Sequence, residues 1–168
     1  EMCIRDSNKI KAALEKVEGV QRRLEIKGKI KDVPVLDDYG HHPTEIKTTL
    51  DALGQGWPGM RKVVVFQPHR YSRTKALFDD FARSFYQADV LLVLPIYAAS
   101  EIPIEGVDSR KLCDSILAHG HKDVRFVEDI DAAAGLLAEL IVPGDVVLTL
   151  GAGNVYQVGE RLLAGSDG

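Results

Sequence analysis

The chain has few cysteines, no long apolar run and no excess of positive charge, and each shortage removes a class of protein. Its two cysteines, Cys3 and Cys113, lie far apart without metal-ligand spacing, so we expect free thiols and a reducing compartment. No apolar run approaches the ~20 residues that cross a bilayer, and no signal peptide is visible. The net charge of -4 gives no general attraction to nucleic acid. We therefore expect a globular domain with neither nucleic acid nor membrane as a partner.

Two common catalytic signatures are also absent from the sequence. There is no Gly-x-x-x-x-Gly-Lys-Ser/Thr loop, so the chain cannot cradle a nucleoside triphosphate in the way that P-loop proteins do. There is no Gly-x-Ser-x-Gly turn of the kind that presents a nucleophilic serine in α/β hydrolases. The sequence therefore gives no sign of a complete catalytic centre.

What the sequence does contain is a regular alternation of short apolar runs and amphipathic stretches. Residues 24–30 and 33–36 flank Lys31-Asp32, which predicts a hairpin. Apolar runs of strand length predict four further strands at 63–66, 90–94, 124–127 and 146–150. Helical spacing predicts helices at 10–17, 43–53, 77–85, 112–117, 136–141 and 155–162. Pro43 suits the first position of one helix, and Asp108 suits the N-cap of another.

The uninterrupted apolar strands indicate the fold class. A strand that is buried on both faces needs no polar alternation, and strands that alternate with helices form parallel sheets. We therefore predict an α/β fold with a mostly parallel sheet, helices on both faces and an N-terminal antiparallel hairpin at one edge. Residues 1–7 fit no periodicity, so we treat them as a non-native or artefactual segment outside this fold.

A polar cluster follows the second strand of the predicted hairpin, where residues 37–43 read Asp-Asp-Tyr-Gly-His-His-Pro. In open α/β sheets, ligands bind where the carboxyl ends of strands meet the following loops. Asp37 and Asp38 could be solvated loop acids, or one of them could orient a nucleotide or a metal-bound water. His41 precedes a helix N-terminus, which favours a neutral imidazole that donates to a bound carboxylate or ligates a metal. No further ligand stands at a suitable spacing, so zinc is disfavoured.

A second polar cluster follows the strand at 63–66, where residues 67–73 read Gln-Pro-His-Arg-Tyr-Ser-Arg. If this segment enters a helix, Arg70 and Arg73 share one face. Two guanidinium groups on one face suit the bidentate capture of a carboxylate or phosphate. The alternative is a solvated basic helix start, but cations there oppose the helix dipole unless an anion binds. We therefore favour an anion site.

Two weaker patterns remain open at this level. Residues 151–154, Gly-Ala-Gly-Asn, follow the last strand but lack the third glycine of a dinucleotide-binding turn, so we interpret them as a tight strand-to-helix turn. Arg22-Arg23 precede the hairpin. They are either surface charge, or one guanidinium is aimed at a phosphate.

Three of these segments together resemble one family. They are Gly-Val-Gln-Arg-Arg-Leu-Glu at 19–25, Asp-Asp-Tyr-Gly-His-His-Pro-Thr-Glu-Ile at 37–46 and Phe-Gln-Pro-His-Arg-Tyr-Ser-Arg-Thr at 66–74. The chain resembles the C-terminal part of Mur ligases, and within that family the members that add L-alanine to UDP-N-acetylmuramate. The resemblance extends through 89–94, 144–147 and 151–154, and the string at 66–73 is its most specific part.

The resemblance implies a three-domain cytoplasmic enzyme of bacterial cell-wall synthesis that requires ATP and Mg²⁺. Such an enzyme forms an acyl phosphate, which the amine attacks, and releases ADP and phosphate. Residues 8–22 would be the last helix of a central ATPase domain, and residues 23–168 would be the Rossmann-like C-terminal domain. ATP and Mg²⁺ would be bound mainly by the central domain. The chain alone would be inactive. In this resemblance Arg23 and Asp38 contact ATP across the domain interface.

The resemblance also places the amino acid. Tyr39 and His41 match positions around the incoming alanine, and Arg70 and Arg73 match positions that hold its carboxylate. The second assignment agrees with the anion site that the residues themselves indicate. Two further motif members receive no role, namely His42 and His69.

Two alternatives remain from the sequence. The first is the related ligase that attaches a recycled tripeptide, which has a similar Asp-Asp-His-His-Pro segment but lacks the string at 66–73. The second is a free-standing module that binds an anion or nucleotide, which would explain the missing P-loop without a longer protein. A P-loop in the upstream reading frame would separate a ligase from such a module.

Overall fold

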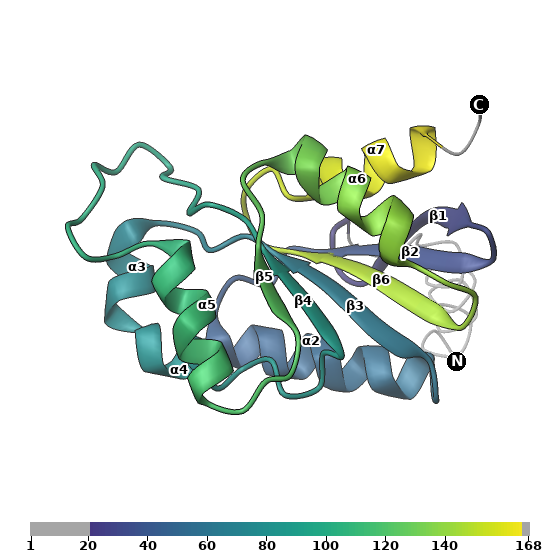
Figure 1. The fold of residues 1–168 in the computed structure, drawn as a ribbon, viewed down its shortest axis with the longest axis horizontal. Helices are drawn as coiled ribbons and strands as arrows, with labels where there is room; N and C mark the ends of the chain where they lie inside the picture. Colours follow the sequence, from purple (N-terminus) through teal and green to yellow (C-terminus); the bar gives the residue numbers. More distant parts are fainter. Residues whose placement is uncertain (1–20, 166–168) are drawn as a thin grey trace, which may run out of the picture.

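The computed structural model describes residues 21–165, which form one six-stranded sheet covered by helices (Figure 1). The strand order is β1-β2-β6-β3-β4-β5. The strands are β1 (Glu25–Ile30), β2 (Val33–Asp38), β3 (Arg61–Phe66), β4 (Val90–Val93), β5 (Val124–Phe126) and β6 (Asp145–Leu150). The helices are α2 (Pro43–Gly56), α3 (Tyr71–Ala76), α4 (Phe78–Ala82), α5 (Ser109–Ala118), α6 (Ile130–Leu140) and α7 (Tyr156–Ala164). None of the helices described is long and apolar enough to cross a membrane.

The predicted hairpin is confirmed and supplies the antiparallel edge of the sheet. β1 pairs antiparallel with β2, and all other neighbouring strands are parallel. Lys31 and Asp32 adopt positive φ angles of 48° and 65°. Two consecutive residues with positive φ form the type of turn that matches the natural twist of a two-residue hairpin. The local sequence therefore places β1 at one edge of the sheet.

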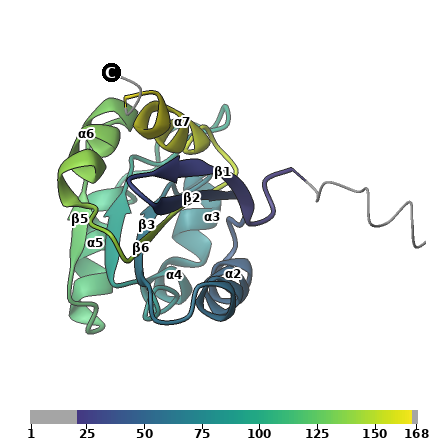
Figure 2. The same cartoon turned by 90° about the vertical axis from the view of Figure 1, so that its right-hand side faces the viewer.

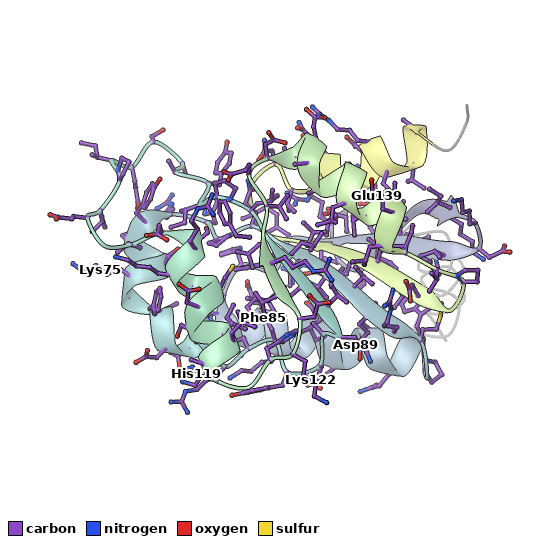
Figure 3. All side chains as sticks on the ribbon, viewed as in Figure 1. Lys75, Phe85, Asp89, His119, Lys122 and Glu139 are labelled. Carbon is purple, nitrogen blue, oxygen red and sulfur yellow. The ribbon has the colours of Figure 1, made fainter. Side chains whose placement is uncertain are left out.

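The sheet is covered on both faces, as the uninterrupted apolar strands predicted. Every residue of β2, β4 and β6 is buried. Figure 2 shows α6 and α7 on one side of the sheet and α2 and α4 on the other. The core on the side of α2 and α4 contains three aromatic rings that pack at tilted angles: Phe66 lies 5.7 Å from Phe81 and 4.9 Å from Phe85, measured between ring centroids. In Figure 3 the labelled Phe85 lies inside the molecule, whereas Lys75 and Lys122 lie at its periphery.

Two predicted helices differ from the structure. The apolar stripe at 77–85 predicted one helix, but α3 and α4 are separate short helices that meet at Leu77, whose φ of -116° is not helical. The apolar residues of this stripe still face the core on both sides of the kink. The spacing of the stripe was therefore correct, although the residues do not form one continuous helix. α6 begins at Ile130, earlier than predicted, because Asp129 caps it by accepting from the N–H of Ala132. The helix predicted at 10–17 lies outside the described residues.

A long connection between β4 and α5, residues 94–108, projects beyond the sheet next to α3 (Figure 1). It is tied to α3 through Glu101, whose carboxylate accepts from the backbone N–H and the hydroxyl of Ser72 at 2.9 and 2.6 Å. These hydrogen bonds, with a coulombic effect of Arg70, lower the pKa of Glu101. The connection is therefore anchored beside the second polar cluster.

Candidate functional site

The two polar clusters meet at the carboxyl edge of the sheet because β6 lies between the strands that carry them. Leu150, the last residue of β6, pairs with Asp38 on one side and with Phe66 on the other. The loops that follow β2, β3 and β6 therefore leave the sheet side by side. This edge is where ligands bind in open α/β sheets. The structure thus brings together the segments 39–42, 67–70 and 151–154, which are far apart in the sequence.

Four aromatic rings form a continuous chain across these loops. Tyr39 meets His41 edge-on with ring centroids 5.3 Å apart, and His41 lies 5.9 Å from His69. His69 stacks on Tyr97, with centroids 5.5 Å apart and planes that differ by 8°. Sequence reasoning named the first three rings but missed Tyr97, because it lies in the connection after β4. Its position a few residues after an apolar strand was the only signal in the sequence that could have revealed it.

The two imidazoles of this ring chain present different hydrogen-bonding groups. His41 Nδ1 lies 3.1 Å from the carbonyl oxygen of Tyr39, which can only accept, so Nδ1 carries the proton. In its neutral form, His41 therefore offers an acceptor at Nε2. Arg73 Nη1 lies 3.1 Å from His69 Nδ1, and because a guanidinium only donates, Nδ1 of His69 is the acceptor. His69 therefore carries its proton at Nε2 when it is neutral.

Both predicted arginines lie at this edge, although not in the way that the dipole argument assumed. Arg70 is exposed and precedes α3 with a φ of 73°, and its N–H donates to the carbonyl of Tyr97 at 2.8 Å. α3 has six residues, and Arg73 lies in its last turn, where a cation is favoured. Opposition to the helix dipole therefore does not support an anion site. What supports it is the number of cationic and donor groups that converge here.

Asp37 and Asp38 are buried, so the interpretation as solvated loop acids is wrong. Asp38 is 4% exposed and accepts from the N–H groups of Leu24 and Gly40 and from the Thr49 hydroxyl at 2.8–3.1 Å. Asp37 is 1% exposed and accepts from Arg22 Nε at 2.7 Å and from the Thr149 hydroxyl at 2.6 Å. Both carboxylates thus hold the end of β2 in place. With 4% of its surface exposed, Asp38 leaves little of its carboxylate accessible to a ligand.

The sequence left the role of Arg22 open, and its contacts show that this role is structural. Besides Asp37, its guanidinium donates to the carbonyls of Gly151 and Gly153 at 2.6 and 3.3 Å. It also lies about 5 Å from the ring centroids of Tyr39 and Tyr156, at 5.0 and 5.1 Å. The neighbouring Arg23 is exposed. The hairpin register could have revealed the contact, because pairing Glu25 with Asp37 brings the residues before β1 to this edge.

His42 has a structural role at the start of α2. It is the N-cap, and its Nδ1 accepts from the N–H of Thr44 at 3.3 Å. The carboxylate of Glu45 completes the cap by accepting from the N–H groups of His41 and His42 at 2.9 and 3.1 Å. These bonds outweigh burial and lower the pKa of Glu45. Pro43 occupies the first position of the helix, as predicted.

The glycine segment after β6 is a tight turn, as interpreted from the sequence. Gly151 has a φ of 147°, and a Cβ there would lie 2.7 Å from the carbonyl oxygen of Gln67. A Cβ on Gly153 would lie 2.8 Å from Cγ of Tyr97. The two glycines therefore let this turn pack directly on the segments that follow β3 and β4. Gln67 also bridges to the turn through its amide, which donates to Asn154 Oδ1 at 2.9 Å.

A metal site is not supported by the part of the chain that the structure describes. No group of three His, Cys, Asp or Glu side chains in residues 21–165 is arranged to hold a metal ion. Cys113 is free and buried, and burial raises the pKa of its thiol to about 12.

A protein-family profile matches this fold and edge. The profile described as Mur ligase, glutamate ligase domain, matches residues 22–153. The chain belongs to the Mur ligase family.

Curated members of the Mur ligase family show how much of such a protein this chain represents. It is 64% identical over 158 residues to a UDP-N-acetylmuramate–L-alanine ligase of Desulforapulum autotrophicum, covering 94% of this chain and 35% of that protein. It is 61% identical to the enzyme of the same name from Desulfosudis oleivorans, with the same coverage of 94% and 35%. The chain thus spans about a third of the length of the curated relatives that it matches.

Solved structures of Mur ligases share the fold. The UDP-N-acetylmuramate–alanine ligase of Thermotoga maritima matches with a TM-score of 0.72 at 29% identity, covering 93% of this chain and 32% of that one. A murein peptide ligase from Psychrobacter arcticus matches with a TM-score of 0.74 at 24% identity, covering 91% of this chain and 31% of that one. At that identity the second likeness concerns the fold alone. The α/β, Rossmann-like prediction with an antiparallel edge hairpin is therefore confirmed.

Proposed function

We propose that this chain is the C-terminal domain of an ATP-dependent ligase that joins L-alanine to UDP-N-acetylmuramate in peptidoglycan precursor synthesis. The observation that carries the proposal is the identity of 64% and 61%, along nearly the whole chain, to ligases of that name. The alternative of a tripeptide ligase is not favoured, because its support is a likeness of fold. The alternative of a free-standing module is not favoured either, because the relatives are about three times as long.

The chemistry of such a ligase matches the groups at the carboxyl edge. The carboxylate of the nucleotide-linked sugar is activated as an acyl phosphate by ATP, and the amine of alanine displaces phosphate to form the amide. An amino acid presents an anionic carboxylate and an amine. Arg70 and Arg73 supply cationic donors for the carboxylate. Tyr39 and His41 lie around the amine in this proposal, and the acceptor at His41 Nε2 suits an N–H group.

The nucleotide contacts divide between a direct and an indirect role. Arg23 is exposed and free to face ATP bound by another domain. Asp38 is engaged by three donors within the chain, so we propose that it acts on ATP by holding the loop after β2. The described residues do not fit a Mg²⁺ site of their own, and we assign the ion mainly to the central domain of the full enzyme. The ligase would work in the cytoplasm, where ATP and uridine nucleotides are found.

We propose that residues 23–168 belong to the C-terminal domain, that 8–22 lead from the central domain, and that 1–7 are not native. The boundary at residue 22 needs one adjustment, because Arg22 donates hydrogen bonds to residues of the sheet and of the turn after β6. We therefore propose that Arg22 belongs with the C-terminal domain.

A chimera tests the function. The matching C-terminal segment of the Desulforapulum autotrophicum ligase is replaced by residues 22–168 of this chain, and phosphate release is measured with UDP-N-acetylmuramate, ATP and Mg²⁺. We expect alanine-dependent turnover at roughly the 1–10³ s⁻¹ typical of enzymes. The chain alone is the matched control and should release no phosphate, because it lacks a P-loop. A folded chimera that accepts a tripeptide but not alanine would overturn the proposal.

A further inference from the structure

Tyr97 is joined to the strand end that carries His69 through the backbone on both sides of that histidine. The N–H of Tyr97 donates to the carbonyl of Pro68 at 2.8 Å, and the N–H of Arg70 donates to the carbonyl of Tyr97 at 2.8 Å. These two bonds form an isolated parallel bridge between His69 and Tyr97. The connection 94–108 thus continues the sheet for one residue beyond β3 and β4. The two rings must therefore leave the backbone side by side.

The Tyr97 ring is also confined on its other side. A Cβ on Gly153 would lie 2.8 Å from Cγ and 3.0 Å from Cβ of Tyr97, so the ring packs on the bare backbone of that glycine. The turn that contains Gly153 is itself held by Arg22. The Tyr97 ring therefore cannot move toward Gly153. The backbone bridge and this packing together favour the parallel stacking of the two rings.

The edge of the His69 ring is fixed by a different residue. Arg73 donates to Nδ1 at 3.1 Å and also to the carbonyl of His69 at 3.2 Å, so the protonated nitrogen of the neutral ring is Nε2. Nε2 makes no hydrogen bond to the residues between 21 and 165 that the structure describes. Burial, followed by the charges of Arg73, His41 and Arg70, lowers the pKa of His69. The ring is thus a neutral donor with its N–H unused.

We propose that Tyr97 is a positioning residue that fixes the plane of the His69 imidazole, and that His69 uses its Nε2–H to donate a hydrogen bond to a carboxylate oxygen of the ligand. That this carboxylate belongs to the amino-acid substrate rests on the proposed function. The geometry excludes His69 as a general base in this arrangement, because its Nδ1 already accepts from Arg73. The two imidazoles then have complementary tasks, with an acceptor on His41 for the amine and a donor on His69 for the carboxylate.

The first experiment needs only this chain. The tautomer and pKa of His69 are measured by ¹⁵N NMR for the wild type and for Tyr97→Phe, Tyr97→Ala and Tyr97→Leu. Tyr86→Ala is the matched control, because Tyr86 is also an exposed tyrosine but lies in the connection before β4. We expect one tautomer, protonated at Nε2, in the wild type, in Tyr97→Phe and in the control.

Tyr97→Ala and Tyr97→Leu, which lack an aromatic ring, should both differ from the wild type. Loss of the ring exposes His69 to water, so its pKa should rise toward the ordinary value and both tautomers should appear. Tyr97→Leu keeps bulk against Gly153, and therefore separates the loss of the ring plane from a collapse of the turn. A wild-type ring protonated at Nδ1, or spectra of Tyr97→Ala and Tyr97→Leu that match the wild type, would overturn the proposal.

The second experiment uses the active chimera. We expect Tyr97→Ala to raise the KM for alanine about tenfold, because misplacing a substrate-orienting group is costly, while the KM for ATP stays within about twofold. Tyr97→Phe should restore the wild-type KM for alanine. If the chimera is inactive, the proposed function fails while the NMR result still decides the role of Tyr97. If the chimera is active and Tyr97→Ala leaves its KM for alanine unchanged, the proposed hydrogen bond between His69 and the carboxylate is wrong.

Discussion

Arg22 Nε donates to the Asp37 carboxylate at 2.7 Å, and this ion pair joins the residue before the edge hairpin to the buried end of β2. Asp37 is 1% exposed, so its charge is out of water and depends on this partner and on Thr149. The same guanidinium reaches the turn after β6. One arginine therefore holds two of the three loops that form the candidate site.

Arg22→Ala should destabilise the chain strongly, whereas Arg23→Ala should not. Removing Arg22 leaves a buried carboxylate and two backbone carbonyls without their partner, which should lower the free energy of unfolding by about 2–4 kcal/mol. Arg23 is exposed, and its loss should change that free energy by less than about 0.5 kcal/mol. Urea unfolding of both variants measures the difference. Equal stabilities would show that the Arg22 contacts contribute nothing.

Two deletions that differ only in Arg22 test where the C-terminal domain begins. Deleting residues 1–21 should leave the stability of the chain nearly unchanged, because the sheet and its helices cover one another without them. Deleting residues 1–22 should cost as much as Arg22→Ala. A cooperative melt that is lost on the shorter deletion would place residues before Arg22 in the core.

The arginine assignment predicts which substrate each variant affects. In the chimera, Arg70→Ala or Arg73→Ala should raise the KM for alanine roughly ten- to a hundredfold, as expected for loss of one charge-assisted contact of about 1.5–3 kcal/mol. Lysine should rescue only in part, because it lacks the planar fork. Arg23→Ala should act chiefly on the KM for ATP. Steady-state kinetics with each substrate varied in turn would contradict this assignment if the KM for alanine stays unchanged.

Gly153→Ala should disturb the site although it adds one methyl group. The new Cβ would lie within 3.0 Å of the Tyr97 side chain, and overpacking of this kind costs about 1–3 kcal/mol. Gly135→Ala is the matched control, because Gly135 lies in α6 with open space around its Cβ position. That variant should stabilise the chain by about 0.5–1 kcal/mol. Thermal melts of both variants provide the comparison, and two shifts of the same sign would contradict the packing argument.

Cys113 should react slowly with alkylating agents in the folded chain. Burial raises the pKa of its thiol to about 12, so at about pH 8 very little of the reactive thiolate is present. Raising the pH increases the thiolate fraction only as that pKa is approached. Peptide mass mapping after iodoacetamide treatment should show modification at least about a hundredfold slower than in guanidinium chloride. Similar rates in both conditions would mean that the thiol is accessible and its pKa is ordinary.

The sequence predicts those features that local patterns determine. The turn at Lys31-Asp32, the proline start of α2 and the Asp108 cap of α5 follow from a few neighbouring residues, and all three are present. Apolar runs located the strands for the same reason. The break at Leu77 escaped prediction, because the apolar period continues through it and only the tertiary packing of α3 and α4 reveals the kink.

The candidate site could be predicted only in part, because its contacts join distant segments. His41 and His69 stand in conspicuous motifs, and the parallel sheet brings their loops together. Arg22 and Tyr97 stand in ordinary sequence, and their roles depend on the register of the hairpin and on the course of the connection after β4. Arg70 and Arg73 were named because two guanidinium groups on one helix face suit an anion. The helix dipole, which was used to reject the alternative of a solvated basic helix start, gives little support in a six-residue helix. Their convergence with His69 supports the same assignment on different grounds.

The hairpin turn at Lys31-Asp32 is a suitable site for attaching a label to this domain. Both residues are exposed, and they lie at the opposite end of β2 from Asp38, roughly 17–20 Å away for a strand of this length. A dye or a surface linker attached to Asp32→Cys would therefore stay clear of the carboxyl edge. The domain could then be tethered with its loops facing solution, so that the arrival and departure of single ligand molecules become observable.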